Sequence, residues 1–134
     1  MPFNDRSLPP VSPEDAARLL ATVAGSVLLP NDAGYDHERA VWNLNHELVP
    51  AVIVVPESAA DVQAAVAFAA GQRRPVLVKT TGHQMVGQAH GAVAIATHRM
   101  NDITIDAAGR TARVGAGVLW SEVIAKAAID ARSA

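Results

Sequence analysis

Cysteine is absent from this 134-residue sequence. Disulfides, thiolate metal sites, a cysteine nucleophile and a cysteine-linked prosthetic group are therefore excluded within the chain. An excess of one charge is also missing, because 11 Lys and Arg residues stand against 13 Asp and Glu residues, for a formal net charge of -2. This balance gives no electrostatic reason to expect nucleic acid or an anionic membrane as a partner.

Long hydrophobic runs are missing too. No apolar stretch approaches the ~20 residues that a membrane span requires, and residues 1–10 lack the apolar core of a signal peptide. We therefore expect a cytoplasmic protein without a membrane partner. Hydrophobic residues still make up 50% of the chain, which is enough for the core of one ordinary domain.

Helix-capping signals and short apolar runs alternate along the chain. Ser12 followed by Pro13 begins a helix that ends at Gly25, and Ser58 begins another that continues to about Ala70. Residues 27–30 are expected to be extended. The other expected elements are buried strands over 51–55 and 75–79, a third strand over 93–96, hairpin strands over 103–106 and 111–114, and helices over 35–43 and 120–128.

The strand–helix–strand order over residues 51–79 is typical of a βαβ unit, which predicts parallel pairing and a right-handed crossover. The expected fold is α/β (or α+β), with a small three-stranded parallel sheet, flanking helices and then the hairpin. We predict a leader and helix over 1–24, a domain over 25–128 and a tail over 129–134. Unpaired edges of the hairpin predict a homo-oligomer, aggregation or partial disorder.

The most informative segment is the loop from Thr80 to Gly91, which follows the strand over 75–79 and holds three glycines and two histidines. Open α/β sheets bind ligands at such carboxyl ends of parallel strands. The glycines allow close backbone approach and positive φ, and successive loop amides suit a pyrophosphate. Lys79 either adds a positive charge at the loop entrance or is simply a strand-end charge.

This loop resembles the pyrophosphate and histidine loop of FAD-linked oxidases of the vanillyl-alcohol oxidase and p-cresol methylhydroxylase type, including the berberine-bridge-like enzymes. The resemblance covers roughly residues 25–127. It implies the first subdomain of an FAD-binding PCMH-type domain and the start of a second, antiparallel subdomain. The segments that carry it are Val78-Lys79-Thr80-Thr81-Gly82-His83-Gln84-Met85-Val86-Gly87, Leu28-Leu29-Pro30, Gly34-Tyr35-Asp36, Val41-Trp42-Asn43, residues 50–70, Arg99-Met100-Asn101, Ile105-Asp106 and residues 111–120.

The resemblance implies that FAD is the cofactor and that a ring nitrogen of His83 bonds to the 8α-methyl carbon of the flavin. The implied activity is that of an FAD-dependent oxidoreductase. In it, the flavin accepts a hydride from an alcohol, a sugar or a similar C–H donor and passes electrons to oxygen. The small-molecule substrate is not identified, and no catalytic residue is assigned. The implied cofactor-binding residues are Lys79, Thr80, Thr81, Gly82, His83, Gln84, Met85, Gly87, Gly115 and Gly117.

The sequence departs from the family pattern in its loop and in its length. The usual Arg-Ser-Gly-Gly-His is replaced by residues 79–83 here, and Thr81 adopts glycine-only backbone angles only at a cost. Gln84 stands where Ser, Asn or Gly is usual. Family members run to several hundred residues, so we expect a truncated member, a frameshifted gene product or a fragment. Its expected protein partner is either a complementing C-terminal polypeptide or another copy of the chain.

Simpler interpretations stay open for the histidines. In a glycine-rich loop His83 also serves as an ordinary turn residue. His83, His90 and His98 lack the spacing and the carboxylate partner of a usual metal site, so no metal is expected.

Other residues also have plain structural interpretations. Trp42 and Trp120 are more typical of packing than of stacking platforms. Arg73-Arg74 is most simply a solvated loop, and Ser58 with Asp61 forms a helix cap. At the level of function, the alternatives to an enzyme are a non-catalytic flavin-binding or interaction module and a plain structural α/β domain.

Overall fold

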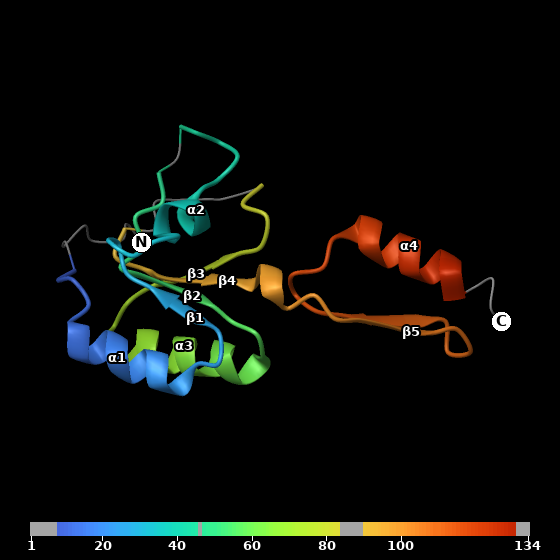
Figure 1. Cartoon of the computed structure of the whole chain (residues 1–134), viewed down its shortest axis with the longest axis horizontal. Helices are drawn as coiled ribbons and strands as arrows, with labels where there is room; N and C mark the ends of the chain where they lie inside the picture. The colour runs from blue at the N-terminus through green and yellow to red at the C-terminus, as the bar shows by residue number, and fades with distance from the viewer. Residues whose placement is uncertain (1–7, 46, 84–89, 131–134) are drawn as a thin grey trace.

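The computed structural model describes residues 8–45, 47–83 and 90–130. Helices cover a first sheet on both faces, while a hairpin with one helix extends away from it (Figure 1). The elements are, in chain order, α1 (Pro13–Thr22), β1 (Ser26–Leu28), α2 (Tyr35–Arg39), β2 (Val52–Val55), α3 (Ala59–Gly71), β3 (Val76–Lys79), β4 (Val93–Ala96), the 3-10 helix η1 (Thr97–Arg99), β5 (Ile103–Asp106), β6 (Thr111–Val114) and α4 (Trp120–Asp130).

The first sheet has four strands in the order β1-β2-β4-β3. β2, β4 and β3 are parallel to one another, which confirms the predicted three-stranded parallel sheet. Two details differ from expectation. β2 and β3 are not neighbours, because β4 pairs between them, and the extended segment that begins at Ser26 joins the sheet as an antiparallel edge strand next to β2.

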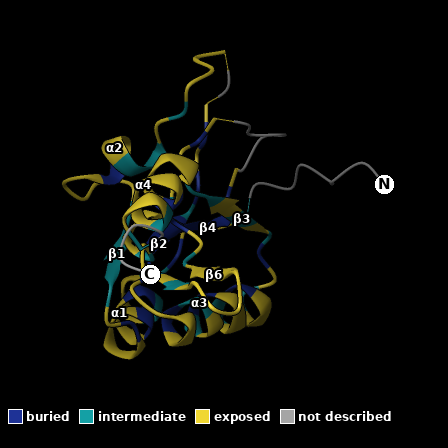
Figure 2. Cartoon of the chain, turned by 90° about the vertical axis from the view of Figure 1, so that its right-hand side faces the viewer, coloured by how far each residue is buried: buried dark blue, intermediate teal, exposed yellow. Residues whose placement is uncertain are grey.

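The core lies on both faces of β2 and β4, whose residues are all buried. On one face α1 and α3 pack against Val52, Val54, Val93 and Ile95. On the other face α2 places Tyr35 against the sheet. The Tyr35 hydroxyl donates a 2.6 Å hydrogen bond to the carbonyl oxygen of Pro50. The buried residues accordingly gather on the first sheet and the helix faces that touch it (Figure 2).

The strand expected over 75–79 is confirmed as β3, but its expected burial is wrong. Val76 and Val78 of β3 are 43% and 60% exposed. β3 is the edge strand of the sheet, and the α1–α3 layer packs on its inner neighbours β4 and β2 instead. An apolar run indicates that a strand is able to be buried, but the helix layer must also extend over it.

The predicted helix caps are confirmed. The Ser12 hydroxyl accepts a hydrogen bond from the backbone N–H of Asp15, and the Ser58 hydroxyl accepts one from that of Asp61. The helix expected over 35–43 is shorter, because the backbone turns to an extended conformation at Ala40. The segment from Ala40 to Asn45 is therefore free to run beside the sheet.

Two interpretations of surface residues are wrong. Arg74 is buried rather than solvated, and its guanidinium donates hydrogen bonds to the carbonyl oxygens of Gly91 (3.0 Å) and Pro9. Trp42 and Trp120 do not pack in a core, because they are 73% and 77% exposed.

The predicted hairpin is confirmed as an antiparallel pair of β5 and β6. Asp106 stabilises its turn by accepting a 2.9 Å hydrogen bond from the N–H of Gly109. α4 packs beside β5, and every residue of β6 is exposed. Among the helices that the structure describes, none has the length and apolar character needed to cross a membrane.

Candidate functional site

The carboxyl ends of β3 and β4 bring three distant segments together. Thr80 follows β3, Thr97 follows β4, and their hydroxyl oxygens lie 2.7 Å apart. Both hydroxyl oxygens also lie within hydrogen-bonding distance of the carbonyl oxygen of Ala116, at 3.1 and 3.3 Å. The loop after β3, the start of η1 and the connection from β6 to α4 therefore meet at one edge of the sheet, which is where open α/β sheets bind ligands.

Gly82 fixes the path of the loop after β3. Its φ is +71°, a conformation that favours glycine. A Cβ at this position would lie 3.3 Å from the carbonyl oxygen of Ala40, and the carbonyl oxygen of Gly82 accepts a hydrogen bond from the N–H of Trp42 at 3.3 Å. The loop is thus packed against the segment that follows α2.

His83 comes next and is exposed. Its ring meets the Trp42 indole edge to face, with ring centroids 6.3 Å apart and an interplanar angle of 67°. The other implied loop residues, Gln84, Met85 and Gly87, lie outside the residues that the structure describes.

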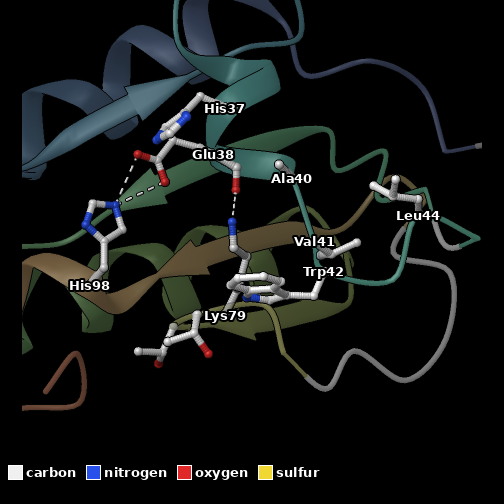
Figure 3. A pocket seen from close by; sticks show the side chains of 10 residues that line it. His37, Glu38, Ala40, Val41, Trp42, Leu44, Lys79 and His98 are labelled. Carbon is white, nitrogen blue, oxygen red and sulfur yellow. Dashed lines mark hydrogen bonds and ion pairs between the residues drawn. The ribbon is translucent and has the colours of Figure 1, made fainter. Parts of the chain in front are cut away.

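Lys79 points toward α2 rather than into open solvent. Its Nζ donates a hydrogen bond to the carbonyl oxygen of Glu38, and burial lowers the pKa of Lys79 while the charge of Glu38 partly opposes this shift. The carboxylate oxygens of Glu38 in turn lie 3.1 Å from Nε2 of His98 (Figure 3). α2, the end of β3 and η1 are therefore tied together by polar contacts.

An open pocket of about 580 Å³ lies beside these residues. Hydroxyl, amine, imidazole and carboxylate groups line part of it, and apolar side chains, including an exposed indole, line the rest (Figure 3). Such a lining suits a ligand with both a charged and a ring-bearing part. The lining residues are His37, Glu38, Ala40, Val41, Trp42, Leu44, Lys79, Thr80, Thr81 and His98.

Gly115 and Gly117 lie close to this edge and are tightly packed against backbone. A Cβ at Gly115 would lie 2.1 Å from the carbonyl oxygen of Met100, and one at Gly117 would lie 2.2 Å from that of Thr97. Both glycines therefore have a packing role in joining the hairpin to η1, whatever ligand binds beside them.

Glu38, Thr97 and His98 were missed by sequence reasoning. The strand expected over 93–96 offered a signal for Thr97 and His98 that was not used, because the rule applied to Thr80 holds equally for residues directly after that strand. Nothing in the sequence pairs Glu38 with His98, since this contact joins residues far apart in the chain. Within the described residues, no three His, Cys, Asp or Glu side chains are grouped to hold a metal ion.

A parallel sheet with a glycine-bearing loop at its carboxyl edge defines a nucleotide-cofactor type of site. The family whose sequence model matches is described as FAD binding domain, and the match covers residues 50–133. The chain belongs to this family, and its α/β fold is that of the PCMH-type FAD-binding flavoenzymes.

Individual relatives are FAD-linked oxidases and oxidoreductases. The (R)-6-hydroxynicotine oxidase of Paenarthrobacter nicotinovorans is 33% identical over 109 residues, which cover 80% of this chain and 24% of that protein. The crystal structure of 6-hydroxy-D-nicotine oxidase from Arthrobacter nicotinovorans matches with a TM-score of 0.75 at 31% identity, over 79% of this chain and 24% of that one. The structure of BBE-like 1 of Physcomitrella patens matches with a TM-score of 0.67 at 25% identity, over 76% of this chain and 23% of that one. The chain spans about a quarter of the length of these relatives.

The described residues fit one side of FAD, which combines a charged pyrophosphate with aromatic rings. The Thr81 hydroxyl and the N–H groups of the Lys79 amine that do not bond Glu38 are donors that suit phosphate oxygens. The exposed indole of Trp42 offers apolar ring surface in the same pocket.

Proposed function

We propose that this chain forms the flavin-binding part of an FAD-dependent oxidoreductase, in which His83 is the covalent attachment residue. The observation that carries the proposal is the position of His83. It is exposed, it lies on the loop at the carboxyl edge of the parallel sheet, and Gly82 directly before it holds the backbone at φ +71°. An exposed imidazole at this place is accessible to the methyl edge of a flavin.

The neighbouring residues bind the rest of the cofactor in this proposal. Main-chain amides of the loop from Thr80 onward, with Gln84, Met85 and Gly87 included, bind the pyrophosphate. Lys79 adds positive charge beside it. Gly115 and Gly117 border the cofactor through their main chain in this proposal, because an added Cβ at either position would meet the backbone of Met100 or Thr97.

Covalent attachment through His83 would replace one C–H bond of the 8α-methyl group and the N–H bond of the His83 ring by a single C–N bond. The two electrons and two protons released would go to oxygen as hydrogen peroxide. When bound, FAD supplies the two-electron chemistry by which an alcohol, a sugar or a similar C–H donor is oxidised at the expense of oxygen. The protein's part is to bind and orient the cofactor.

A His83→Ala variant tests the proposal. The chain is expressed, supplied with FAD and denatured in acid, and flavin fluorescence is then measured on the protein band. We expect fluorescence that stays with the wild-type chain and is lost in the variant, because only the imidazole provides the bond. His90→Ala, another exposed histidine of the same loop, is the matched control and keeps the fluorescence. A wild-type chain that carries no attached flavin and does not bind added FAD would contradict the cofactor assignment.

A non-catalytic flavin-binding or interaction module is the second candidate. Exposed surface on the hairpin unit favours this candidate, because a partner could cover it. Every residue of β6 is exposed, and so are the α4 side chains Trp120, Ile124 and Ile129. The partner we propose is a complementing C-terminal polypeptide or a second copy of the chain, in the cytoplasm. Peroxide production by the chain alone supports the enzyme, whereas flavin binding without turnover supports the module.

A further inference from the structure

Trp42 is an exposed aromatic residue that lies outside the buried core of the first sheet. Its side chain is 73% exposed, although a large apolar ring in contact with water gains nothing for folding. Leu44, two residues later, is 92% exposed and lines the same pocket. Exposed apolar side chains that line one pocket mark a contact surface more often than a scattered single residue does.

The backbone nevertheless holds Trp42 in a defined position. Its N–H donates to the carbonyl oxygen of Gly82 at 3.3 Å. The backbone of Ala40 and Val41 lies against Gly82, so that an added Cβ would come within 3.3 to 3.4 Å of it. Lys79 anchors the same segment through the carbonyl oxygen of Glu38. These contacts tie the segment 38–42 to the loop 79–83 at several points.

The only ring contact of Trp42 in the described part of the chain is with His83. The two planes are inclined by 67°, so one ring presents its edge to the face of the other. Edge-to-face pairs restrict the relative orientation of the two rings. An exposed imidazole otherwise rotates freely, and its reactive nitrogen then points in many directions.

Building on the proposed function of His83, we infer that Trp42 is a positioning residue for flavin attachment. Its indole orients the imidazole of His83 and presents apolar ring surface to the methyl-bearing edge of FAD. This positioning role falls to the segment after α2, which is not part of the glycine-rich loop that carries His83. It also explains why an indole stays exposed at this point while its backbone is fixed.

The first experiment examines the ring contact in the chain without cofactor. Imidazole proton resonances of His83 are recorded by NMR in the wild type, Trp42→Phe, Trp42→Ala and Trp120→Ala. Ring-current shifts of His83 should disappear in Trp42→Ala and persist in Trp120→Ala. Trp120 is the matched control because it is 77% exposed and lies on α4. Unchanged His83 resonances in Trp42→Ala would overturn the contact.

The second experiment measures the rate at which acid-stable flavin fluorescence appears on the same four proteins after addition of FAD. We expect Trp42→Ala to be about three- to tenfold slower, the range that one aromatic pair corresponds to. Trp42→Phe should recover most of the rate, and Trp120→Ala should match the wild type. Thermal unfolding midpoints should agree among all four, since neither indole is buried.

The outcomes separate the two proposals. If the wild type takes up flavin through His83 and Trp42→Ala does so at the same rate, the inference for Trp42 is wrong while the proposed function stands. If the wild type takes up no flavin, the proposed function fails and the role of Trp42 fails with it. Slower uptake in Trp42→Ala with recovery in Trp42→Phe supports an aromatic positioning role, which a merely structural residue would not show.

Discussion

Among single residues, Asp61 contributes more than the helix cap that its position after Ser58 predicts. It is only 2% exposed. Its carboxylate accepts hydrogen bonds from the N–H groups of Glu57 (2.9 Å), Ala24 (2.9 Å) and Gly25 (3.1 Å). The bond from Glu57 is the largest cause of a lowered pKa for Asp61, and the other backbone bonds add to it, although desolvation opposes them. Asp61 thereby joins the start of α3 to the end of α1.

We expect Asp61→Asn to lower the free energy of unfolding by about 2 to 4 kcal/mol, because an amide nitrogen would face backbone donors that lose a charged acceptor. Urea denaturation at neutral pH measures this loss. Asp32→Asn is the control, since Asp32 accepts one exposed bond from Leu29 and should cost about 0.5 kcal/mol.

The pH dependence follows from the direction of the same pKa shift. A carboxyl whose pKa is lower in the folded state stabilises the protein fully above its unfolded pKa of about 3.9 and loses this contribution as pH falls through the folded value. The stability of the wild type should therefore drop more steeply below pH ~4 than that of Asp61→Asn. Parallel acid profiles for the two proteins would contradict the assignment.

Among the strands, β3 and β4 differ in solvent exposure although their sequences are similarly apolar. Val76 and Val93 are register partners, yet Val76 is 43% exposed and Val93 is fully buried. We predict that Val93→Thr lowers the free energy of unfolding by about 1 to 3 kcal/mol, because it places a hydroxyl in the core. Val76→Thr should stay within about 0.5 kcal/mol of the wild type. If chemical denaturation gave equal losses of unfolding free energy for the two variants, β3 would have to be as deeply buried as β4.

This pair also shows where sequence-based prediction ends. Short apolar runs and serine caps are local signals, and they identified the strands and the starts of α1 and α3. The order of strands depends on contacts between distant segments, so the insertion of β4 beside β3 was not predicted. Thr97 and His98 join the site because β4 lies beside β3. Since this strand order was not predicted, only the loop after β3 was assigned to the site. The burial of Arg74 likewise depends on Pro9 and Gly91, which are distant in the chain.

At the scale of the whole molecule, the described residues form two units, which meet where the hairpin unit contacts the carboxyl edge of the first sheet. The first sheet with its helices forms one, and the hairpin with α4 forms the other (Figure 1). The contact is made by the Thr80 and Thr97 hydroxyls on Ala116 and by the backbone of residues 115–117 against η1 and the residues after it. Because polar and backbone contacts form it, the hairpin unit should open more readily than the first sheet.

Gly117→Ala tests whether this contact joins the two units. A Cβ at Gly117 would lie 2.2 Å from the carbonyl oxygen of Thr97 and 2.8 Å from the backbone of His98, so backbone must move. We expect hydrogen exchange to speed up about tenfold or more in β5, β6 and α4, which corresponds to about 1.4 kcal/mol, while β2 and β4 keep their protection. Gly71→Ala is the control, because a Cβ there meets nothing within 4 Å and a helical alanine is favoured over glycine. If the hairpin of Gly117→Ala exchanged at the wild-type rate, residues 115–117 would not be what holds it against the carboxyl edge of the sheet, and β5, β6 and α4 would have to be stable on their own.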